Sequence, residues 1–559
     1  MRFPHQVMIH SAFIQAGSQL ARWLSALGVA TDSGAFHICI EKDLVLGEGF
    51  AIQAGEAGVR ITSGSPGGAF YGVYAFLEEM LGCRFLAEDC ILLLQGSLEM
   101  KPGEYSSAPA FSYRELYWRG ALPADTALQL RLNASRGGLP RGLACGPRFY
   151  NYSHSFDALV DPEVWFDSHP EYFSLVGGVR QKEQSQLCLT NKEVLALVID
   201  KVRAWMREHP DCNVFSVSMN DWYAPCECAA CAAIDAREGS QSGSLLSFIN
   251  QVADAVKAEF PDNFIHTFAY LYGRKPPRTL RARDNVIIRL CPIERCFSHG
   301  IDVCGAEARL IDVKAARTAP FSEGGSFRSD LQGWAQACRH LYIWDYTTNY
   351  ANYLQPFPNL QGLRQTLQWY RDQGVSGVFL QGNYSPGQAS AFAALKVYVM
   401  ARLLWDPEAD LNQLTLRFVT GYYGSKAAPL VLAYLALAEE AVRGHHMSLY
   451  DGPDAPYFAG GWLQRGVALL EQALALTADP LQRQRIEREL LSPRYVLLAA
   501  SPSDAPGRAA RVDSFAANCR RLGITELFER RELQASFDCL KKSRYARDRS
   551  DVPYTVYRL

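Results

Sequence analysis

The sequence predicts an α/β protein built on a (β/α)8 TIM-type barrel, with a small N-terminal α/β domain before the barrel and a C-terminal helical domain after it. Three observations lead to this prediction. The chain has 559 residues, too many for one ordinary hydrophobic core. Its middle part alternates strand-like and helix-like apolar patterns, and its last part contains helical patterns almost alone. We place the three domains at residues 1–107, 108–406 and 407–559.

The first region combines short strands with one well-marked helix. The apolar runs Phe36–Ile40 and Gly58–Thr62 are typical of strands. A Gly-rich turn, Gly64–Gly68, precedes an expected helix over Ala69–Leu81, which should end at Gly82, because glycine commonly follows the last turn of a helix. The turn matches neither the P-loop nor the dinucleotide fingerprint, so it does not predict phosphate binding.

The middle region predicts the barrel. Helical patterns lie between several strand-like runs: Val194–Met206 follows Asn191 as its N-cap, and Leu245–Val256 carries its apolar side chains on one face. Strands that alternate with helices form a parallel sheet, and eight such units indicate a closed barrel, with an open doubly wound sheet as the alternative. The expected strands are Tyr113–Trp118, Ser153–Phe156, Gln186–Leu189, Val214–Met219, Phe264–Tyr270, Val286–Leu290, Leu341–Trp344 and Val375–Leu380.

Composition and charge argue against two classes of function, nucleic-acid binding and membrane insertion. The net charge of −2 gives no electrostatic case for a nucleic-acid partner, and no apolar run approaches the roughly 18 residues of a membrane span. The N-terminus lacks the basic start and apolar run of a secretory signal, and 15 scattered cysteines do not resemble a disulfide framework. We therefore expect a cytoplasmic protein, or a secreted or periplasmic one if a signal has been removed.

Carboxylates recur where the expected strands end. In (β/α)8 barrels the active site lies at the carboxyl ends of the strands. Asp221 follows the fourth strand, Glu238 lies in the loop behind it, Glu294 follows the sixth strand and Asp345 follows the seventh. Cleavage of a glycosidic bond needs one carboxyl group to protonate the leaving oxygen and a second group at the anomeric carbon. These four acids are our candidate catalytic residues, and salt bridges or helix caps are the structural alternative.

Aromatic and amide side chains accompany these acids. Aromatic residues make up 12% of the chain, and the faces of pyranose rings need flat apolar surfaces beside polar groups. We therefore expect a glycan substrate. The candidate substrate-binding residues are Asn220, Trp222, Trp344, Tyr346, Asn349, Gln381 and His154.

Several short motifs follow one another between about residues 60 and 430. They are Tyr71–Glu78 with Leu81–Arg84, His169–Phe173, Gln186–Leu189, Asn220–Trp222 with Cys226–Cys228 and Cys231, Glu238–Ser240, Trp344–Tyr346, Pro356–Asn359, Leu404–Pro407 and Tyr422–Gly424. On these motifs the chain resembles the bacterial domain of unknown function 4838 family. Part of that family became glycoside hydrolase family 163, the endo-β-N-acetylglucosaminidases that act on N-glycans. The first region resembles the small domain that precedes the barrel in hexosaminidases and glucuronidases.

This resemblance implies hydrolysis of a β-linked N-acetylhexosamine, with no required cofactor. In many such enzymes the acetamido oxygen of the substrate attacks the anomeric carbon, so the enzyme supplies no nucleophile. We expect Asp221 to hold the acetamido group and Glu238 or Glu294 to act as the acid/base. We expect Asp345, together with the amide and tyrosine side chains named above, to bind sugar hydroxyl groups.

One position departs from the family pattern. Relatives often end the eighth strand with Gly-Val-Phe-Glu-Gln-Gly, whereas this chain has Leu380 in the acidic position. The departure leaves two alternatives open: a glycosidase for another sugar, such as a uronic acid, or a catalytically inactive glycan-binding protein. Neighbouring strand residues face opposite ways, so if Gln381 points into the barrel mouth, position 380 faces the helices, where leucine is suitable.

Three closely spaced cysteines form a separate candidate site. Cys226, Cys228 and Cys231 could hold a structural zinc ion, with Cys188 or His299 as a fourth ligand. The alternatives are a loop stiffened by buried thiols and a local disulfide.

Overall fold

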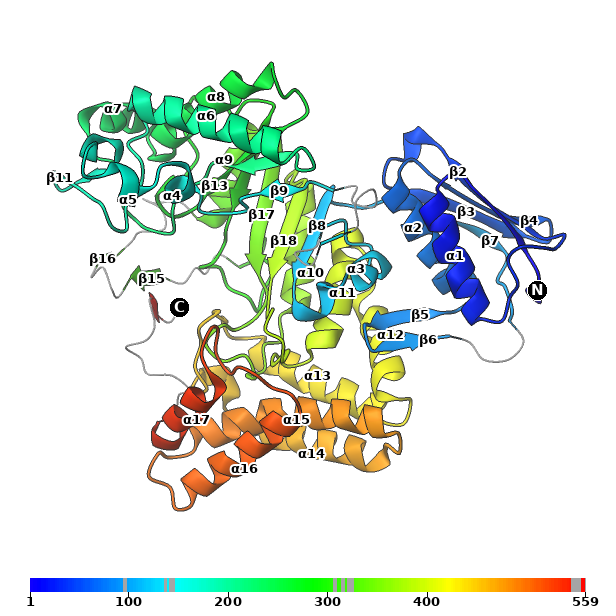
Figure 1. The fold of residues 1–559 in the computed structure, drawn as a ribbon. Coiled ribbons are helices and arrows are strands. Elements are labelled where there is room, and N and C mark those ends of the chain that lie inside the picture. The colour runs from blue at the N-terminus through cyan, green and yellow to red at the C-terminus, as the bar shows by residue number, and fades with distance from the viewer. Residues whose placement is uncertain are drawn as a thin grey trace.

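The computed structural model of the chain describes residues 1–93, 98–134, 138–139, 146–304, 309–312, 317–318, 326–543 and 554–557. In Figure 1 a small N-terminal unit lies to one side of a central parallel sheet, and a helical layer lies below that sheet. None of the described helices is both long enough and apolar enough to cross a membrane.

The N-terminal unit is a mixed five-stranded sheet covered by two helices. Its strands lie in the order β1-β2-β4-β3-β7, and both strands expected from the sequence are present as β2 and β4. The side chain of Ser65 accepts a hydrogen bond from the Gly68 N–H, so the Gly-rich turn serves as the N-cap of α2. The elements are β1 (Met8–Ser11), α1 (Ile14–Ala26), β2 (His37–Lys42), β3 (Phe50–Gly55), β4 (Gly58–Ser63), α2 (Pro66–Ala75), the hairpin β5 (Arg84–Ala87) and β6 (Cys90–Leu92), and β7 (Gly103–Ser107).

Among the described residues the central sheet has seven parallel strands, curled in the order β8-β18-β17-β14-β13-β12-β9. Neighbours in the sheet are neighbours in the chain, and the last strand pairs with the first, as in a (β/α) barrel. The two strands at the ends of the sheet, β8 and β9, contact each other through side chains, since the ring centres of Tyr113 and Phe149 lie 5.5 Å apart. The hydroxyl groups of Tyr113 and Tyr152, two residues beyond β9, lie 2.5 Å apart. The strands are β8 (Tyr113–Tyr117), β9 (Phe149–Tyr150), β12 (Val214–Ser216), β13 (Phe264–Ala269), β14 (Val286–Leu290), β17 (His340–Tyr346) and β18 (Gly377–Gln381).

Two of the eight expected strands are wrong. The second strand is Phe149–Tyr150 instead of Ser153–Phe156, because Asn151 and His154 adopt left-handed backbone conformations (φ 48° and 49°) that end extended structure. The expected third strand, Gln186–Leu189, contributes only one isolated bridge, between Leu187 and Phe173, and β9 pairs directly with β12.

Helices cover the outside of the sheet. Asn191 accepts hydrogen bonds from the N–H groups of Glu193 and Val194, which confirms it as the N-cap of α6. The helices between strands are α3 (Ala124–Gln129), α4 (Phe156–Leu159), α5 (Pro162–Trp165), α6 (Lys192–Glu208), α7 (Ala229–Glu238), α8 (Ser242–Lys257), α9 (Phe327–Ala337) and α10 (Leu360–Asp372), and α11 (Ala393–Trp405) follows the last strand.

The C-terminal part is helical, as its pattern predicts. α13, α14 and α15 pack side by side, and α12 contacts both α11 and α15. Because α11 also contacts β8, this layer joins the central sheet through α11. A C-terminal strand, β19 (Tyr554–Tyr557), pairs with β15 (Arg309–Asp312), which also pairs with β16 (Arg317–Thr318). The helices are α12 (Leu411–Tyr423), α13 (Ala428–Val442), α14 (Trp462–Leu476), α15 (Pro480–Ala500), α16 (Arg508–Arg521) and α17 (Leu533–Lys542).

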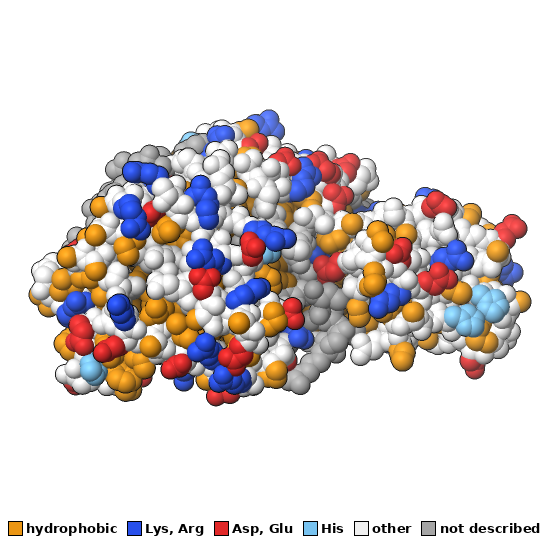
Figure 2. Space-filling view, turned by 90° about the horizontal axis from the view of Figure 1, so that it is seen from above, with side chains coloured by type: hydrophobic (Ala, Val, Ile, Leu, Met, Phe, Trp, Pro, Cys, Tyr) orange, Lys and Arg blue, Asp and Glu red, His pale blue; other side chains and the backbone are white. Residues whose placement is uncertain are grey.

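The surface charge is mixed. On the face drawn in Figure 2, acidic and basic side chains are interspersed over both the small unit and the main body, in keeping with a net charge of −2. This face has no continuous basic area of the kind that nucleic-acid binding usually requires.

Candidate active site at the carboxyl ends of the strands

The interior of the curled sheet holds a buried cation surrounded by aromatic rings. The guanidinium carbon of Arg289, on β14, lies 4.5 to 6.0 Å from the centres of five rings, and its side chain is fully buried. Its N–H groups make no hydrogen bond to any residue that the structure describes. Cation–π attraction therefore stabilises this charge, and burial closes it to a substrate. The rings belong to Tyr113, Phe149, Tyr152, Tyr342 and Trp344.

A buried carboxylate accompanies this cation. Glu115, on β8, accepts hydrogen bonds from the hydroxyl groups of Tyr113 at 2.5 Å and Tyr152 at 3.3 Å. Its negative charge is one of the contributions that raise the pKa of Arg289 against the lowering effect of burial. Glu115 was not among the residues expected from the sequence, although alternation along Tyr113–Tyr117 places it on the same face as two tyrosines.

Three predicted binding residues come together at the carboxyl ends of the strands. The indole N–H of Trp344 donates a hydrogen bond to the Gln381 side-chain oxygen at 2.8 Å. The centres of the Trp344 and Phe268 rings lie 5.7 Å apart. The centres of the His154 and Phe268 rings also lie 5.2 Å apart, and Nδ1 of His154 lies 2.9 Å from the Met219 carbonyl oxygen. The side chains of His154, Trp344 and Gln381 are all half-buried, so they can offer polar and apolar surface to a ligand.

Asp221 is exposed on the loop that follows β12. Burial raises the pKa of Cys291, and the negative charge of Asp221 raises it further, so the two residues lie near each other. Because Cys291 directly follows β14, Asp221 lies at the carboxyl end of the sheet. Trp222, beside it, is 37% exposed. Asp221 is therefore the predicted catalytic acid whose side chain is open to solvent.

The other three predicted acids are buried, and each is engaged by neighbouring protein groups. Glu238 ends α7 and accepts hydrogen bonds from the Thr279 hydroxyl and from the N–H groups of Thr279 and Leu280, at 2.8 to 3.1 Å. Burial alone would raise the pKa of Glu238, but these hydrogen bonds outweigh it and lower the pKa to about 2. Glu238 therefore fastens the chain around residue 279 to the end of α7.

Glu294 and Asp345 form buried ion pairs. Glu294 pairs with Arg274, whose Nε also lies 2.7 Å from Asp330 of α9. Asp345 receives two hydrogen bonds from Arg295, at 3.0 and 3.1 Å, and one from the Tyr370 hydroxyl of α10 at 2.9 Å. Asp330 and Tyr370 belong to surrounding helices, so both acids tie the strand ends to the helical layer.

The remaining predicted binding residues have different surroundings. The Asn220 side chain is buried and bonded to Asp157 and to the Ser185 carbonyl oxygen. Asn349 is also buried; it accepts from the N–H of Ala351 and donates to the Asp451 carbonyl oxygen. Both residues therefore organise loops. Tyr346 is half-buried, with its ring at an angle of 85° to a neighbouring tyrosine ring.

Leu380 is fully buried in the main hydrophobic cluster of the molecule, between β18 and the helices. Its strand neighbours face the other way, since Phe379 belongs to the interior cluster and Gln381 bonds Trp344. The expectation that position 380 faces the helices is confirmed.

A loop of the helical part also reaches these strand ends. Tyr384, just after β18, stacks on Tyr117 at 4.6 Å, and its hydroxyl donates to Glu529 at 3.1 Å. Burial raises the pKa of Glu529, an effect that the Tyr384 hydrogen bond and the charge of Arg530 partly oppose. The two partners are 145 residues apart in the sequence, so no local pattern indicated Glu529.

A cavity of about 900 Å³ lies elsewhere, between α10, α11, α12 and α13. Its walls include Lys396 and Glu439, and none of the four predicted catalytic acids lines it. Burial lowers the pKa of Lys396 to about 7. The predicted acids and the cavity therefore belong to different parts of the molecule.

A comparison with protein families assigns the chain to one family. Residues 99–436 match the family described as "Domain of unknown function (DUF4838)", and this match spans more than half of the chain. The chain belongs to the DUF4838 family. The matched part of this DUF4838 protein includes the whole seven-stranded sheet and all four predicted catalytic acids. No curated protein matches the chain.

Solved structures of glycoside hydrolases resemble the DUF4838 chain. A family GH115 4-O-methyl-α-glucuronidase with specificity for decorated arabinogalactans has a TM-score of 0.57 at 11% identity, over 95% of this chain and 80% of that one. A β-N-acetylhexosaminidase from Bacteroides fragilis has a TM-score of 0.44 at 11% identity, over 75% and 91%. A GH20 β-N-acetylhexosaminidase from Streptomyces coelicolor has a TM-score of 0.44 at 14% identity, over 81% and 95%. The first of these similarities shows a shared fold.

Proposed function

We propose that this DUF4838 protein is a glycoside hydrolase that cleaves a glycan containing β-linked N-acetylglucosamine, by substrate-assisted retaining hydrolysis. One observation carries the proposal: the exposed carboxylate of Asp221 and the half-buried side chains of Trp344, Gln381 and His154 lie at the same end of a barrel-like sheet. A pyranose ring needs this combination of a flat apolar face, hydrogen-bonding edges and a nearby carboxylate.

Asp221 is assigned to the acetamido group of the substrate. In the substrate-assisted scheme the acetamido oxygen attacks the anomeric carbon, and an enzyme carboxylate orients the acetamido nitrogen and stabilises its developing positive charge. Such a carboxylate must be accessible and firmly placed. The loop that carries Asp221 meets the second requirement, because the Gln186 side chain hydrogen-bonds to the backbone of both neighbouring residues, Asn220 and Trp222.

Glu529 is assigned as the acid/base. A general acid at neutral pH needs a raised pKa, and burial gives Glu529 this property beside the aromatic pair formed by Tyr117 and Tyr384. Glu238 and Glu294 were the candidates expected from the sequence. Hydrogen bonds stabilise Glu238 in its charged form, so it is not suited to hold and release a proton. Glu294 is engaged in a buried ion pair with Arg274.

A uronic-acid glycosidase is the second candidate. Arg530 is exposed beside Tyr384, with its Nε 3.4 Å from the tyrosine hydroxyl, and an exposed guanidinium group is well suited to bind the carboxylate of a uronic acid. The fold shared with a family GH115 glucuronidase supports this alternative at the level of architecture only.

A substrate panel distinguishes the two. Wild-type protein should release product from an aryl β-N-acetylglucosaminide or from an N-glycan with a chitobiose core. If it instead hydrolyses aryl glucuronides or their 4-O-methyl derivatives, and Arg530→Ala abolishes this activity, the second candidate is correct. Saturable glycan binding without product release from any substrate would contradict both assignments and identify an inactive glycan-binding protein.

A further inference from the structure

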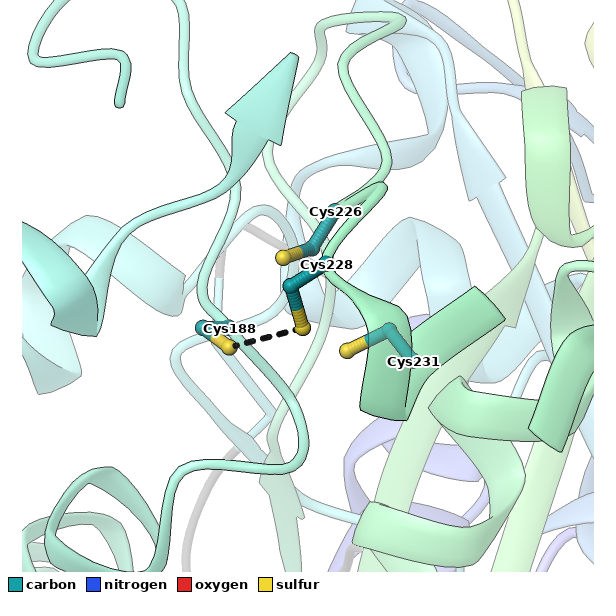
Figure 3. A group of neighbouring side chains, drawn as sticks. All are labelled: Cys188, Cys226, Cys228 and Cys231. Carbon is teal, nitrogen blue, oxygen red and sulfur yellow. Dashed lines mark hydrogen bonds between the residues drawn. The ribbon is translucent and has the colours of Figure 1, made fainter. Parts of the chain in front are cut away.

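Four cysteine sulfur atoms lie close together beside the loop that follows β12 and carries Asp221. Cys226, Cys228 and Cys231 come from the segment between β12 and α7 and from the first turn of α7, and Cys188 comes from the segment before α6 (Figure 3). All four sulfur atoms lie within 4.8 Å of one another, and those of Cys188 and Cys228 are 3.7 Å apart. Figure 3 shows the four side chains pointing toward a common centre.

The distances fit a metal ion better than a disulfide. Zinc binds thiolate sulfur at about 2.3 Å, so the sulfur atoms of a tetrahedral site are separated by about 3.8 Å. A disulfide bond is only about 2.05 Å long. The Cys188–Cys228 separation of 3.7 Å therefore matches the edge of a zinc tetrahedron.

Hydrogen-bond donors and a cation lie near the sulfur atoms. The Leu175 N–H donates to the Cys226 sulfur at 3.4 Å, and the Thr190 hydroxyl lies 3.3 Å from the Cys231 sulfur. A guanidinium N–H of Arg180 lies 3.9 Å from the Cys226 sulfur. Four thiolates around Zn²⁺ carry a net charge of −2, which these donors and the Arg180 cation partly offset.

We propose that Cys188, Cys226, Cys228 and Cys231 bind one structural zinc ion, which holds the loop that carries Asp221 in place. Four protein ligands close the coordination sphere, which is typical of a structural site and leaves no position for substrate. Gln186 holds the Asn220–Trp222 backbone at one end of this segment, and the metal would hold residues 226–231 at the other. The metal site does not depend on the proposed hydrolase activity.

A second group of ligands lies at the junction of the sheet with the helical part. Cys296, His299, Cys304 and His446 have their ligand atoms within 4.8 Å of one another. Nδ1 of His299 lies 3.4 Å from the Cys296 sulfur, and Nδ1 of His446 lies 3.5 Å from the Cys304 sulfur. Zn–S and Zn–N bonds of about 2.3 and 2.0 Å predict a tetrahedral S···N separation of about 3.5 Å.

The hydrogen bonding of His299 supports this site independently. Its Nε2 lies 2.9 Å from the Arg443 carbonyl oxygen, so the ring proton resides on Nε2 and Nδ1 is left with its lone pair. Histidines that bind metals usually donate their other N–H to a carbonyl or carboxylate in this way. We infer that this Cys2His2 group binds a second zinc ion, which would join the loop after β14 to the chain that follows α13.

Metal analysis of the intact chain, expressed with added zinc and purified under reducing conditions, tests both sites. Elemental analysis should find two zinc ions per chain. Cys228→Ser should remove one of them and His446→Ala the other, whereas the matched controls Cys39→Ser and His445→Ala should retain two. His446 is exposed, so its replacement should leave the fold intact.

Each outcome decides one site. A wild-type content of zero overturns both proposals, and a content of one that survives either variant overturns the site altered in that variant. If Cys228→Ser fails to fold, cobalt(II) bound to the wild-type chain provides a second measurement, because tetrahedral thiolate ligation gives charge-transfer absorption. Mass spectrometry after thiol alkylation would reveal a Cys188–Cys228 disulfide, which would also exclude the first site.

Discussion

The carboxamide of Gln186 holds the Asn220 backbone from both sides: its oxygen accepts from the Asn220 N–H and its nitrogen donates to the Asn220 carbonyl, each at 2.9 Å. The same nitrogen also donates to the Trp222 carbonyl oxygen at 2.7 Å. Asp221 lies between the two bonded residues, so one buried side chain on a separate segment fixes the loop of the proposed catalytic carboxylate.

Replacing Gln186 should therefore reduce both catalysis and stability. Gln186→Leu leaves buried backbone groups unsatisfied, which costs about 1–3 kcal/mol of unfolding free energy, and it frees the Asp221 loop. We expect turnover on the best substrate of the panel to fall at least about tenfold while the protein remains folded at 25 °C. Denaturation curves and steady-state kinetics measure the two effects. Unchanged turnover would show that the loop does not need this restraint.

Glu238 should matter for stability at neutral pH. Its folded pKa of about 2 lies below the unfolded value of 4.5, so its contribution to stability is fully present above pH 4.5 and is lost as pH falls toward 2. Glu238→Gln should lower the unfolding free energy clearly at pH 7 and much less at pH 3. Urea denaturation at the two pH values checks this. An equal loss at both values would contradict the assigned role.

Lys396 should destabilise the protein at neutral and acidic pH. Burial lowers its pKa from 10.5 to about 7, so the unfolded chain binds one more proton between pH 7 and 10.5, and stability rises with pH across that range. Lys396→Met removes this penalty. The variant should be more stable than wild type at pH 6, by an amount on the order of a few kcal/mol, and the gain should shrink toward pH 10. A gain independent of pH would indicate a packing effect instead.

Leu380 should not be a missing catalytic acid. Its side chain lies in the main hydrophobic cluster, so Leu380→Glu would bury a carboxylate among apolar groups. We expect a loss of several kcal/mol in unfolding free energy and no increase in turnover, with Leu380→Met as the volume-matched control. An active and stable Leu380→Glu variant would restore the inactive-protein alternative.

Periodicity located most of the fold but did not settle the site. Val286–Leu290 is a strand with the bounds expected from the sequence, because four of its five residues are the large aliphatic residues typical of buried parallel strands. Ser153–Phe156 was wrong because the positive φ angles of Asn151 and His154 depend on tertiary contacts. The pattern of Gln186–Leu189 is typical of a strand, but Gln186 hydrogen-bonds to the loop that carries Asp221 and Cys188 belongs to the cysteine cluster.

The partners of the predicted acids could not be found from the sequence either. Sequence position placed Glu294 and Asp345 near strand ends, but it could not show that Arg274 and Arg295 pair with them. Alternation along β17 does separate Trp344, which faces the interior, from Asp345, which faces the helices, and it could have been applied. Glu529 lies in the loop between α16 and α17, far from Tyr384 in the sequence, and only the three-dimensional structure shows that the two residues are in contact.

The turnover of Asp221→Asn and Glu238→Gln, compared with that of wild type on an aryl β-N-acetylglucosaminide and a chitobiose-core glycan, tests the roles proposed for the two acids. We expect Asp221→Asn to keep an unchanged melting temperature and to lose at least about a hundredfold in kcat, since one positioned charge contributes that much to a transition state. Glu238→Gln should keep kcat within a few fold despite lower stability. Near-full turnover of Asp221→Asn, or loss of turnover in folded Glu238→Gln, would contradict these roles.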